Sequence, residues 1–105
     1  MSGLQRVRPW IASALAALAV GCGGPPQMGP DPETFKAVDA LFTAVSLRET
    51  PLVDRCEAQL RELQSSGKLP EPASKELAAI CEEARGGRWE PAQVRLREFM
   101  KGQRR

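Results

Sequence analysis

Histidine and tyrosine are absent from this 105-residue chain, and its aromatic residues are limited to two tryptophans and three phenylalanines. The lack of histidine excludes Ser/His and Cys/His nucleophile pairs and every histidine-containing metal site. The glycine pairs at 23–24 and 86–87 lack the spacing of a phosphate-binding loop. The carboxylates are scattered at intervals typical of solvated helix surfaces. We therefore expect no enzymatic activity, no metal and no cofactor.

The scarcity of aromatic residues also narrows the fold class. A core for this chain must consist mostly of leucine, alanine, valine and isoleucine, which favours packed helices over a β-sandwich. About seventy residues remain for folding once an export signal and a Pro/Gly-rich segment are set aside, which is a marginal size for one domain. A crosslink or a partner would therefore contribute a large share of the stability.

From Cys22 onward, the chain also lacks an excess of charge of either sign. The net charge of +2 comes from Arg6 and Arg8, so the chain from Cys22 onward is balanced and nucleic acid is not an expected partner. The distribution is uneven, because residues 31–84 carry six basic and eleven acidic side chains, whereas residues 85–105 carry seven basic and two acidic. Two interpretations stay open: the basic end packs beside acidic helices and finishes in a solvated tail, or it contacts anionic headgroups or an acidic partner.

The N-terminal segment has the organisation of an export signal. Arg6 and Arg8 precede an apolar run of eleven residues at positions 10–20. As a helix, this run would extend about 16 Å, roughly half of a bilayer's hydrocarbon thickness. It is therefore interpreted as the hydrophobic region of a signal peptide over residues 1–21, not as a membrane span.

The residues that end this segment, Leu18-Ala19-Val20-Gly21-Cys22, resemble the lipobox of bacterial lipoproteins, although Ala19 stands where leucine is usual. The resemblance implies cleavage between Gly21 and Cys22 and attachment of acyl chains to the Cys22 thiol. Gly23 replaces the aspartate that retains such proteins at the inner membrane, so the resemblance favours the outer membrane of a bacterial cell envelope, with the domain facing the periplasm or the exterior. A plain secretory signal is the alternative.

Residues 22–31 are predicted to be the lipidated cysteine and a disordered tether. The stretch from Gly23 to Pro32 contains three glycines and four prolines and has no apolar period. Such a composition is typical of an extended spacer without packed contacts, up to about 30 Å long. The remaining boundaries are a helical domain over residues 32–102 and a basic tail over residues 103–105.

Four dipeptides with proline second mark helix starts, because proline is tolerated in the first turn and the residue before it can cap the helix. They are Asp31-Pro32, Thr50-Pro51, Glu71-Pro72 and Glu90-Pro91. Gly67 and the pair at 86–87 are the expected helix stops. Apolar residues recur at helical spacing in all four segments. We predict an all-α fold in which two helical hairpins form a small bundle or a short solenoid-like unit.

Cys56 and Cys81 lie at equal distances from the turn predicted near Lys68 and Leu69. In an antiparallel hairpin these two positions face each other on the apolar seam, as do Leu60 and Leu77. An oxidising compartment would then favour a disulfide between them. By closing the intervening loop, this bond would stabilise the fold by roughly 3 to 4 kcal/mol. Two free buried thiols are the alternative. A catalytic redox role is a third, disfavoured because a Cys-x-x-Cys spacing is lacking.

Residues 77–96 are spaced somewhat like a helical hairpin of the tetratricopeptide type, through Leu77, Ile80, Ala84, Gly87, Trp89, Ala92 and Leu96. The preceding hairpin aligns with this one in two competing registers, which argues against a true repeat. The run Gly-Arg-Trp-Glu-Pro-Ala also resembles a segment of short helical bacterial lipoproteins, a resemblance that implies no activity.

The residues considered for binding are Trp89, Arg95, Arg104 and Arg105. Trp89 is either an exposed recognition anchor or a core residue that heads the last apolar stripe. Three functions stay open. The first is a lipid-anchored, non-catalytic module that binds a protein or another envelope component through a helix face or the groove between its hairpins. The others are a structural coat lipoprotein and a small membrane-active lipoprotein.

Overall fold

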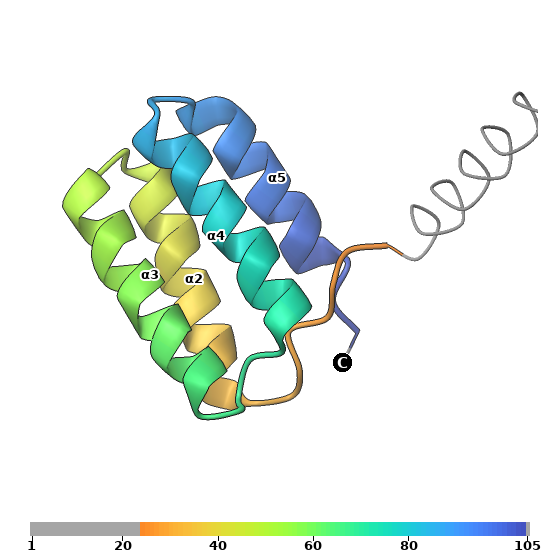
Figure 1. Ribbon diagram of the computed structural model, residues 1–105. Helices are drawn as coiled ribbons and strands as arrows, with labels where there is room; N and C mark the ends of the chain where they lie inside the picture. The colour runs from red at the N-terminus through yellow and green to blue at the C-terminus, as the bar shows by residue number, and fades with distance from the viewer. Residues whose placement is uncertain (1–23, 105) are drawn as a thin grey trace, which may run out of the picture.

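The computed structural model describes residues 24–104 of the chain, which form four α-helices (Figure 1). They are α2 (Pro32–Ser46), α3 (Thr50–Ser65), α4 (Glu71–Arg85) and α5 (Trp89–Lys101). Within residues 24–104 there is no strand, so the predicted all-α fold is confirmed. The expected signal peptide, with Gly21 and Cys22 of its cleavage and lipidation site, and Arg105 at the other end lie outside the described residues.

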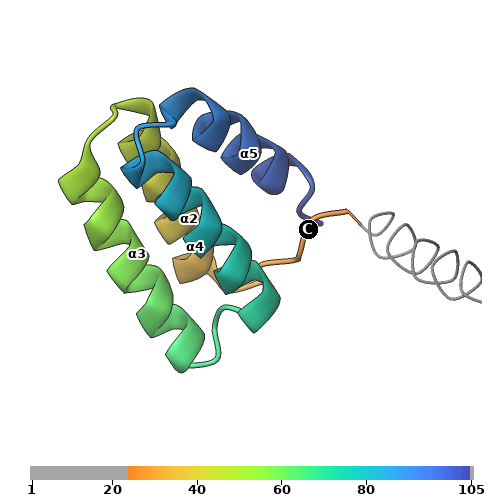
Figure 2. The same cartoon turned by 45° about the horizontal axis from the view of Figure 1, so that its top comes forward.

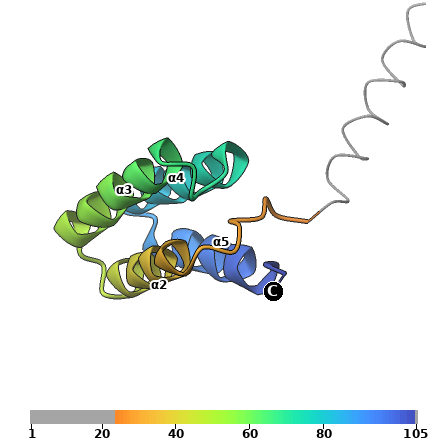
Figure 3. The same cartoon turned by 90° about the horizontal axis from the view of Figure 1, so that it is seen from below.

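The four helices form an antiparallel bundle. Each packs against the next in sequence, and α5 returns to pack against α2, which closes the ring. Seen from below, the bundle has two layers, α3 beside α4 and α2 beside α5 (Figure 3). Of the two predicted arrangements, the bundle is therefore present and not the solenoid, because a solenoid would leave the first and last helices apart.

Proline begins the helices much as expected, but only one of the predicted caps forms. The Asp31 carboxylate accepts a hydrogen bond from the Glu33 amide at 2.9 Å. Thr50 and Glu71 are instead the first residues of their helices, with Glu49 and Pro70 at the capping positions and no side-chain bond there. The last helix likewise begins at Trp89, before its Glu-Pro pair. Proline fits several positions of a first turn, so it does not fix which residue caps.

The helix ends share one backbone conformation. Gly67 and Gly87 have φ angles of 81° and 84° and follow α3 and α4 as predicted. The corresponding position after α2 is Arg48, with φ 56°. At all three ends, the next amide donates to a carbonyl five residues earlier, for example Glu49 to Ala44 at 3.1 Å. A side chain with a Cβ is strained in this region, so the α2 end is the least favourable of the three.

The core consists mostly of aliphatic side chains, together with Met28, the two cysteines and one phenylalanine, Phe99, which is 1% exposed. The predicted apolar stripes supply most of it, including Val38, Leu41, Val45, Val53, Leu60, Leu77, Ile80 and Leu96. Phe35, Phe42, Leu52, Trp89 and Met100 pack against this core but remain partly exposed. None of the helices in residues 24–104 has the length and apolarity needed to cross a bilayer.

Candidate functional site

The segment before α2 and the segment after α5 meet at one end of the bundle, where residues 25–28 lie beside the C-terminal residues (Figure 2). The Gln27 side chain joins them. Its amide nitrogen donates to the Gly102 carbonyl at 3.0 Å, and its amide oxygen accepts from the Arg104 backbone amide at 2.8 Å. A side-chain amide thereby takes the place of a peptide group in a two-strand ladder.

Gln103 makes the reciprocal pair of bonds. Its amide nitrogen donates to the Pro26 carbonyl at 2.9 Å, and its amide oxygen accepts from the Met28 amide at 2.7 Å. We call residues 25–28 and 102–104, joined by these four bonds, the glutamine clasp. The Met28 side chain is 4% exposed and belongs to the core.

The clasp corrects the expectation of a tether without packed contacts. Residues 25–30 pack against the bundle, and Gln103 and the Arg104 backbone hold them there. The physical reason is that an otherwise polar, proline-rich segment carries one large apolar side chain, Met28, and burying it is favourable. Proline also lowers the conformational entropy that this segment loses on docking.

Gly102 allows the two parts of the clasp to approach closely. A Cβ added to Gly102 would overlap the ring of Pro25. The φ angle of Gly102 is −82°, which any residue can adopt. Glycine is therefore needed at this position for space, not for backbone conformation.

A cleft of about 630 Å³ opens beside the clasp, between α2 of the first hairpin and α5 of the second. Its volume lies within the range of small-molecule and peptide side-chain pockets. The apolar part of its lining includes two methionines, whose flexible side chains adapt to different shapes. The lining residues are Gln27, Met28, Gly29, Pro30, Phe35, Asp39, Met100, Gln103 and Arg104.

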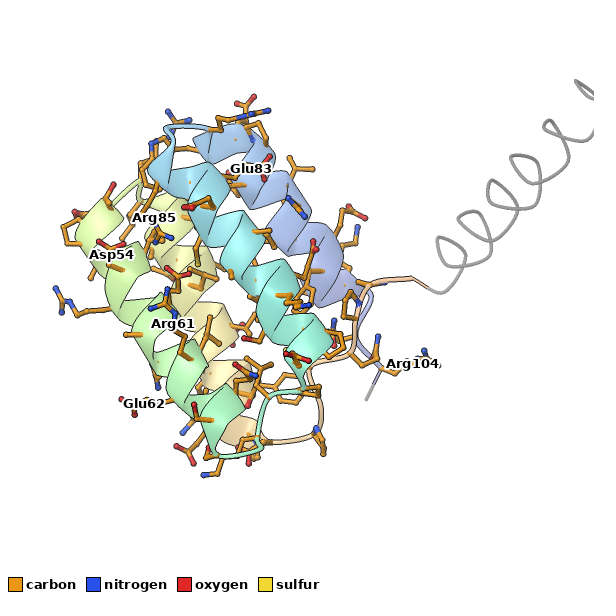
Figure 4. The ribbon with its side chains drawn as sticks, viewed as in Figure 1. Asp54, Arg61, Glu62, Glu83, Arg85 and Arg104 are labelled. Carbon is orange, nitrogen blue, oxygen red and sulfur yellow. The ribbon has the colours of Figure 1, made fainter. Side chains whose placement is uncertain are left out.

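Opposite charges flank this cleft. Asp39 and Arg104 are both exposed, and the Arg104 side chain points away from the helices (Figure 4). Further along the same pair of helices, the Arg97 guanidinium lies 6.0 Å from the ring centroid of Phe42. The cleft thus combines an apolar floor with a charged rim, a combination suited to binding an amphipathic surface.

The predicted disulfide is absent. Cys56 and Cys81 are both free thiols and both buried, the second of the two open alternatives for these residues. They belong to the same core between α3 and α4, so the facing register did place them in one seam. Facing positions are not sufficient for a bond, because packed helix axes lie about 8–10 Å apart whereas a disulfide requires Cα atoms about 5.5–6 Å apart.

Burial also makes both thiols unreactive. Desolvation, and to a smaller extent the nearby negative charge of Glu57, raise the pKa of Cys81 to about 12. The pKa of Cys56 is raised as well, mainly by desolvation and against a smaller opposing effect of Arg55. Thiolate is the nucleophilic form, so neither cysteine is activated for chemistry at neutral pH.

An ion-pair network seals the edge of the same seam. The Arg85 Nη1 atom lies 2.6 Å from the Glu57 carboxylate and 3.0 Å from Asp54 (Figure 4). Glu57 is 7% exposed, and Arg61 forms a second, looser pair with it at 3.4 Å. Hydrogen bonding to Glu57 raises the pKa of Arg85 further, so the guanidinium stays charged. These groups neutralise one another, so their role is structural.

Two of the sequence-predicted binding residues are engaged within the bundle. Arg95 Nε lies 2.8 Å from Glu76 Oε2, and its Nη1 lies 3.4 Å from Glu83, which ties α5 to α4. Trp89 is half-buried and packs against the core at the start of α5. Only Arg104 of the predicted set lines the cleft, whereas Arg105 is outside the described residues.

Within residues 24–104, no group of His, Cys, Asp and Glu side chains is arranged to hold a metal ion. A scan against protein-family models matches none of them, and searches of curated proteins and of solved structures find no match to this chain. The cleft and its surroundings are therefore the structural basis for inferring a function. Sequence reasoning missed most of the cleft, since its only local signal was a single large apolar residue, Met28, in a proline-rich segment.

Proposed function

We propose that this chain is a lipid-anchored, non-catalytic interaction module of a bacterial cell envelope, with the α2/α5 cleft as its binding site. The lipobox-like sequence that ends at Cys22 supports the anchor. The cleft supports the binding role. Its partner is an envelope protein that presents an apolar side chain flanked by polar groups, because the lining has an apolar floor and a rim with one acidic and one basic residue.

The observation that carries this proposal is the cleft of about 630 Å³ between helices. Elsewhere the bundle buries its apolar stripes well, with Val38, Leu41 and Leu96 at 0% exposure. Five apolar side chains that pack against this core stay partly exposed, and two of them, Phe35 and Met100, line the cleft. Apolar side chains left accessible beside a cavity are where an additional apolar group is accommodated most favourably.

Site-specific photocrosslinking in living cells tests the binding role. A photoreactive residue at Asp39, on the rim of the cleft, should give a discrete crosslinked product. The same residue at Gln59, exposed on α3, is the matched control and should not give that product. Met100→Trp, which fills the cleft, should abolish the product from position 39. Identical products from both positions, or no effect of filling the cleft, would contradict the proposal.

Intact mass of the protein extracted from membranes tests the anchor. We expect cleavage before Cys22 together with the added mass of acyl chains, and Cys22→Ser should remove both. Cys56→Ser is the control, because this buried thiol is not part of the lipobox-like sequence and the acyl mass should remain. An uncleaved chain without acyl mass would refute the anchor while leaving the crosslinking result to stand by itself.

A further inference from the structure

The glutamine clasp shortens the connection between the domain and the proposed anchor. Residues 25–28 are held against the C-terminus by four side-chain hydrogen bonds and by the burial of Met28. Between Cys22 and the clasp, only residues 23 and 24 remain. Three peptide units reach at most about 11 Å, compared with about 30 Å for a ten-residue spacer that is free along its length.

The basic side chains of the bundle fall into two groups. Arg85 and Arg95, for example, are neutralised by carboxylates of α3 and α4. Eight others form no salt bridge to a carboxylate in residues 24–104; five of them are Lys36, Arg48, Arg55, Lys75 and Arg88, and the three in the second half of α5 and in the clasp are Arg97, Lys101 and Arg104. We call these three residues the basic end of the bundle.

Geometry places the basic end on one side of the molecule. Arg97 and Lys101 are one helical turn apart on α5 and are both exposed. Arg104 belongs to the clasp and points away from the helices on the side where residues 24–28 approach the bundle (Figure 4). Two exposed acids, Glu98 and Asp39, share this region, so basic residues are in excess but are not alone.

We infer that the basic end rests on the anionic lipid headgroups of the membrane that holds the anchor, and so fixes the orientation of the domain. The inference depends on the proposed lipid anchor. A basic side chain is attracted to an anionic bilayer surface within about one Debye length, which is about 8 Å at physiological ionic strength. A connection of about 11 Å keeps the basic end near that range, whereas a free spacer of about 30 Å would not.

This orientation has a consequence for the cleft. Arg104 is both a member of the basic end and a cleft-lining residue, so the cleft opens close to the membrane surface. A partner of the cleft would then be approached along the membrane and not from the aqueous space above it. The exposed turn between α2 and α3, at the opposite end of the bundle, would face away from the lipid (Figure 1).

The test measures which end of the acylated full-length protein lies near the lipid. A fluorophore is attached at one of two exposed positions that flank α2: Pro30→Cys, beside the clasp, or Leu47→Cys, at the opposite end of the helix. The buried thiols at 56 and 81 have raised pKa values and react slowly, so labelling is selective. The protein is reconstituted into phosphatidylglycerol/phosphatidylcholine vesicles that contain a lipid with a headgroup nitroxide quencher.

We expect quenching at position 30 to exceed quenching at position 47 by about twofold or more in these vesicles, and the difference to shrink in about 1 M salt, where the Debye length is about 3 Å. The double variant Lys101→Glu/Arg104→Glu should remove the difference. Arg55→Glu/Arg88→Glu changes the charge equally toward the other end of the bundle and should preserve the difference, since Arg55 lies in the first half of α3 and Arg88 immediately precedes α5.

Three outcomes separate this inference from the proposed anchor. If the protein does not float with vesicles of pure phosphatidylcholine in high salt, the anchor is absent and the proposed function fails. If it floats but quenching is equal at both positions with anionic lipid, the anchor stands and the orientation is refuted. If quenching differs equally with and without phosphatidylglycerol, the basic end does not act through anionic headgroups and the inference is likewise overturned.

Discussion

The seam between α3 and α4 is closed, whereas the seam between α2 and α5 is partly open. In the first, Leu60, Leu77 and Cys81 are at most 3% exposed, and Arg85 and Glu57 seal its edge at 2.6 Å. In the second, Phe35 and Met100 are only partly covered and a cleft of about 630 Å³ lies beside them. The two seams are built from the same kinds of residue but differ in how completely their side chains are packed.

Connectivity explains the difference. The closed seam joins helices that are consecutive in the chain, so a five-residue connection holds them in register. The open seam joins the first and last helices, which meet only when the bundle closes. Gln93 of α5 bonds to Ser46 of α2 at 3.0 Å at one end of this seam, and the clasp fastens the other. Between these fastenings packing is incomplete, which leaves room for a ligand.

The largest expected difference between the seams comes from truncating one apolar side chain in each. Leu77→Ala removes a side chain that is 1% exposed and should lower the free energy of unfolding by about 3 kcal/mol. Met100→Ala, in the partly open seam, should lower it by only about 1 kcal/mol, because the cleft already leaves part of that side chain solvated. Urea unfolding of both variants measures this difference. Equal losses would mean that the open seam is packed as tightly as the closed one.

A pH titration probes the closed seam alone. Burial raises the pKa of the Cys81 thiol to about 12 from an ordinary value of 9.0. The folded state therefore favours the neutral thiol, so the stabilisation is fully present below pH 9 and is lost as pH rises from 9 to 12. At pH 11 the loss should be about 2–3 kcal/mol.

Cys81→Ala, which does not titrate, is the reference for this measurement. The difference in unfolding free energy between wild type and variant should change over pH 9–11, since every other ionisable group is present in both proteins and cancels. A constant difference would show that the thiol is more hydrated than its 0% exposure implies.

The clasp that fastens the open seam is tested by Gly102→Ala. The added Cβ would overlap the Pro25 ring, so the clasp should open with a loss of about 1–2 kcal/mol and with faster hydrogen exchange at the Met28 amide. Gly86→Ala is the matched control at the end of α4, where an added Cβ would meet its nearest neighbour, the Glu83 carbonyl oxygen, at 3.5 Å. Unchanged exchange at Met28 in Gly102→Ala would rule out the clasp.

The smallest expected effect is a gain in stability from a substitution that changes neither seam. Arg48→Gly relieves the φ angle of 56° at the end of α2 and should raise the free energy of unfolding by about 0.5–1 kcal/mol. Thermal unfolding measures the gain, and the ratio of the losses from Leu77→Ala and Met100→Ala should be unaltered in this background. A loss of stability would mean that the Arg48 side chain makes contacts that offset its strain.

Local patterns predicted the elements better than the contacts between them. The apolar spacing found all four helices, and Gly67 and Gly87 ended two of them as expected. Cys56 and Cys81 were correctly placed in one buried seam, yet they do not bond, because the separation of two helices depends on every side chain between them. The register of a hairpin predicts which positions face each other, but it does not predict the distance between the facing residues.

The cleft could be predicted least. Gln27 and Gln103 are 76 positions apart, and neither belongs to a sequence motif that predicts its hydrogen-bond partners. Each glutamine bonds to backbone groups of the other's segment only because α2 begins and α5 ends at the same end of a closed bundle. Arg95, which the sequence offered as a binding residue, is engaged by Glu76 for the same reason, since the packing of α4 beside α5 brings them together.

The sequence by itself determined the helices and the all-α class, because periodicity, proline and glycine act within a few residues along the chain. The tertiary structure alone decided which surface stayed open, which basic residues kept a free charge and where the segment before α2 docked. Those features depend on the distance between segments remote in the chain, and that distance is set by how all the side chains of the core fill the same volume.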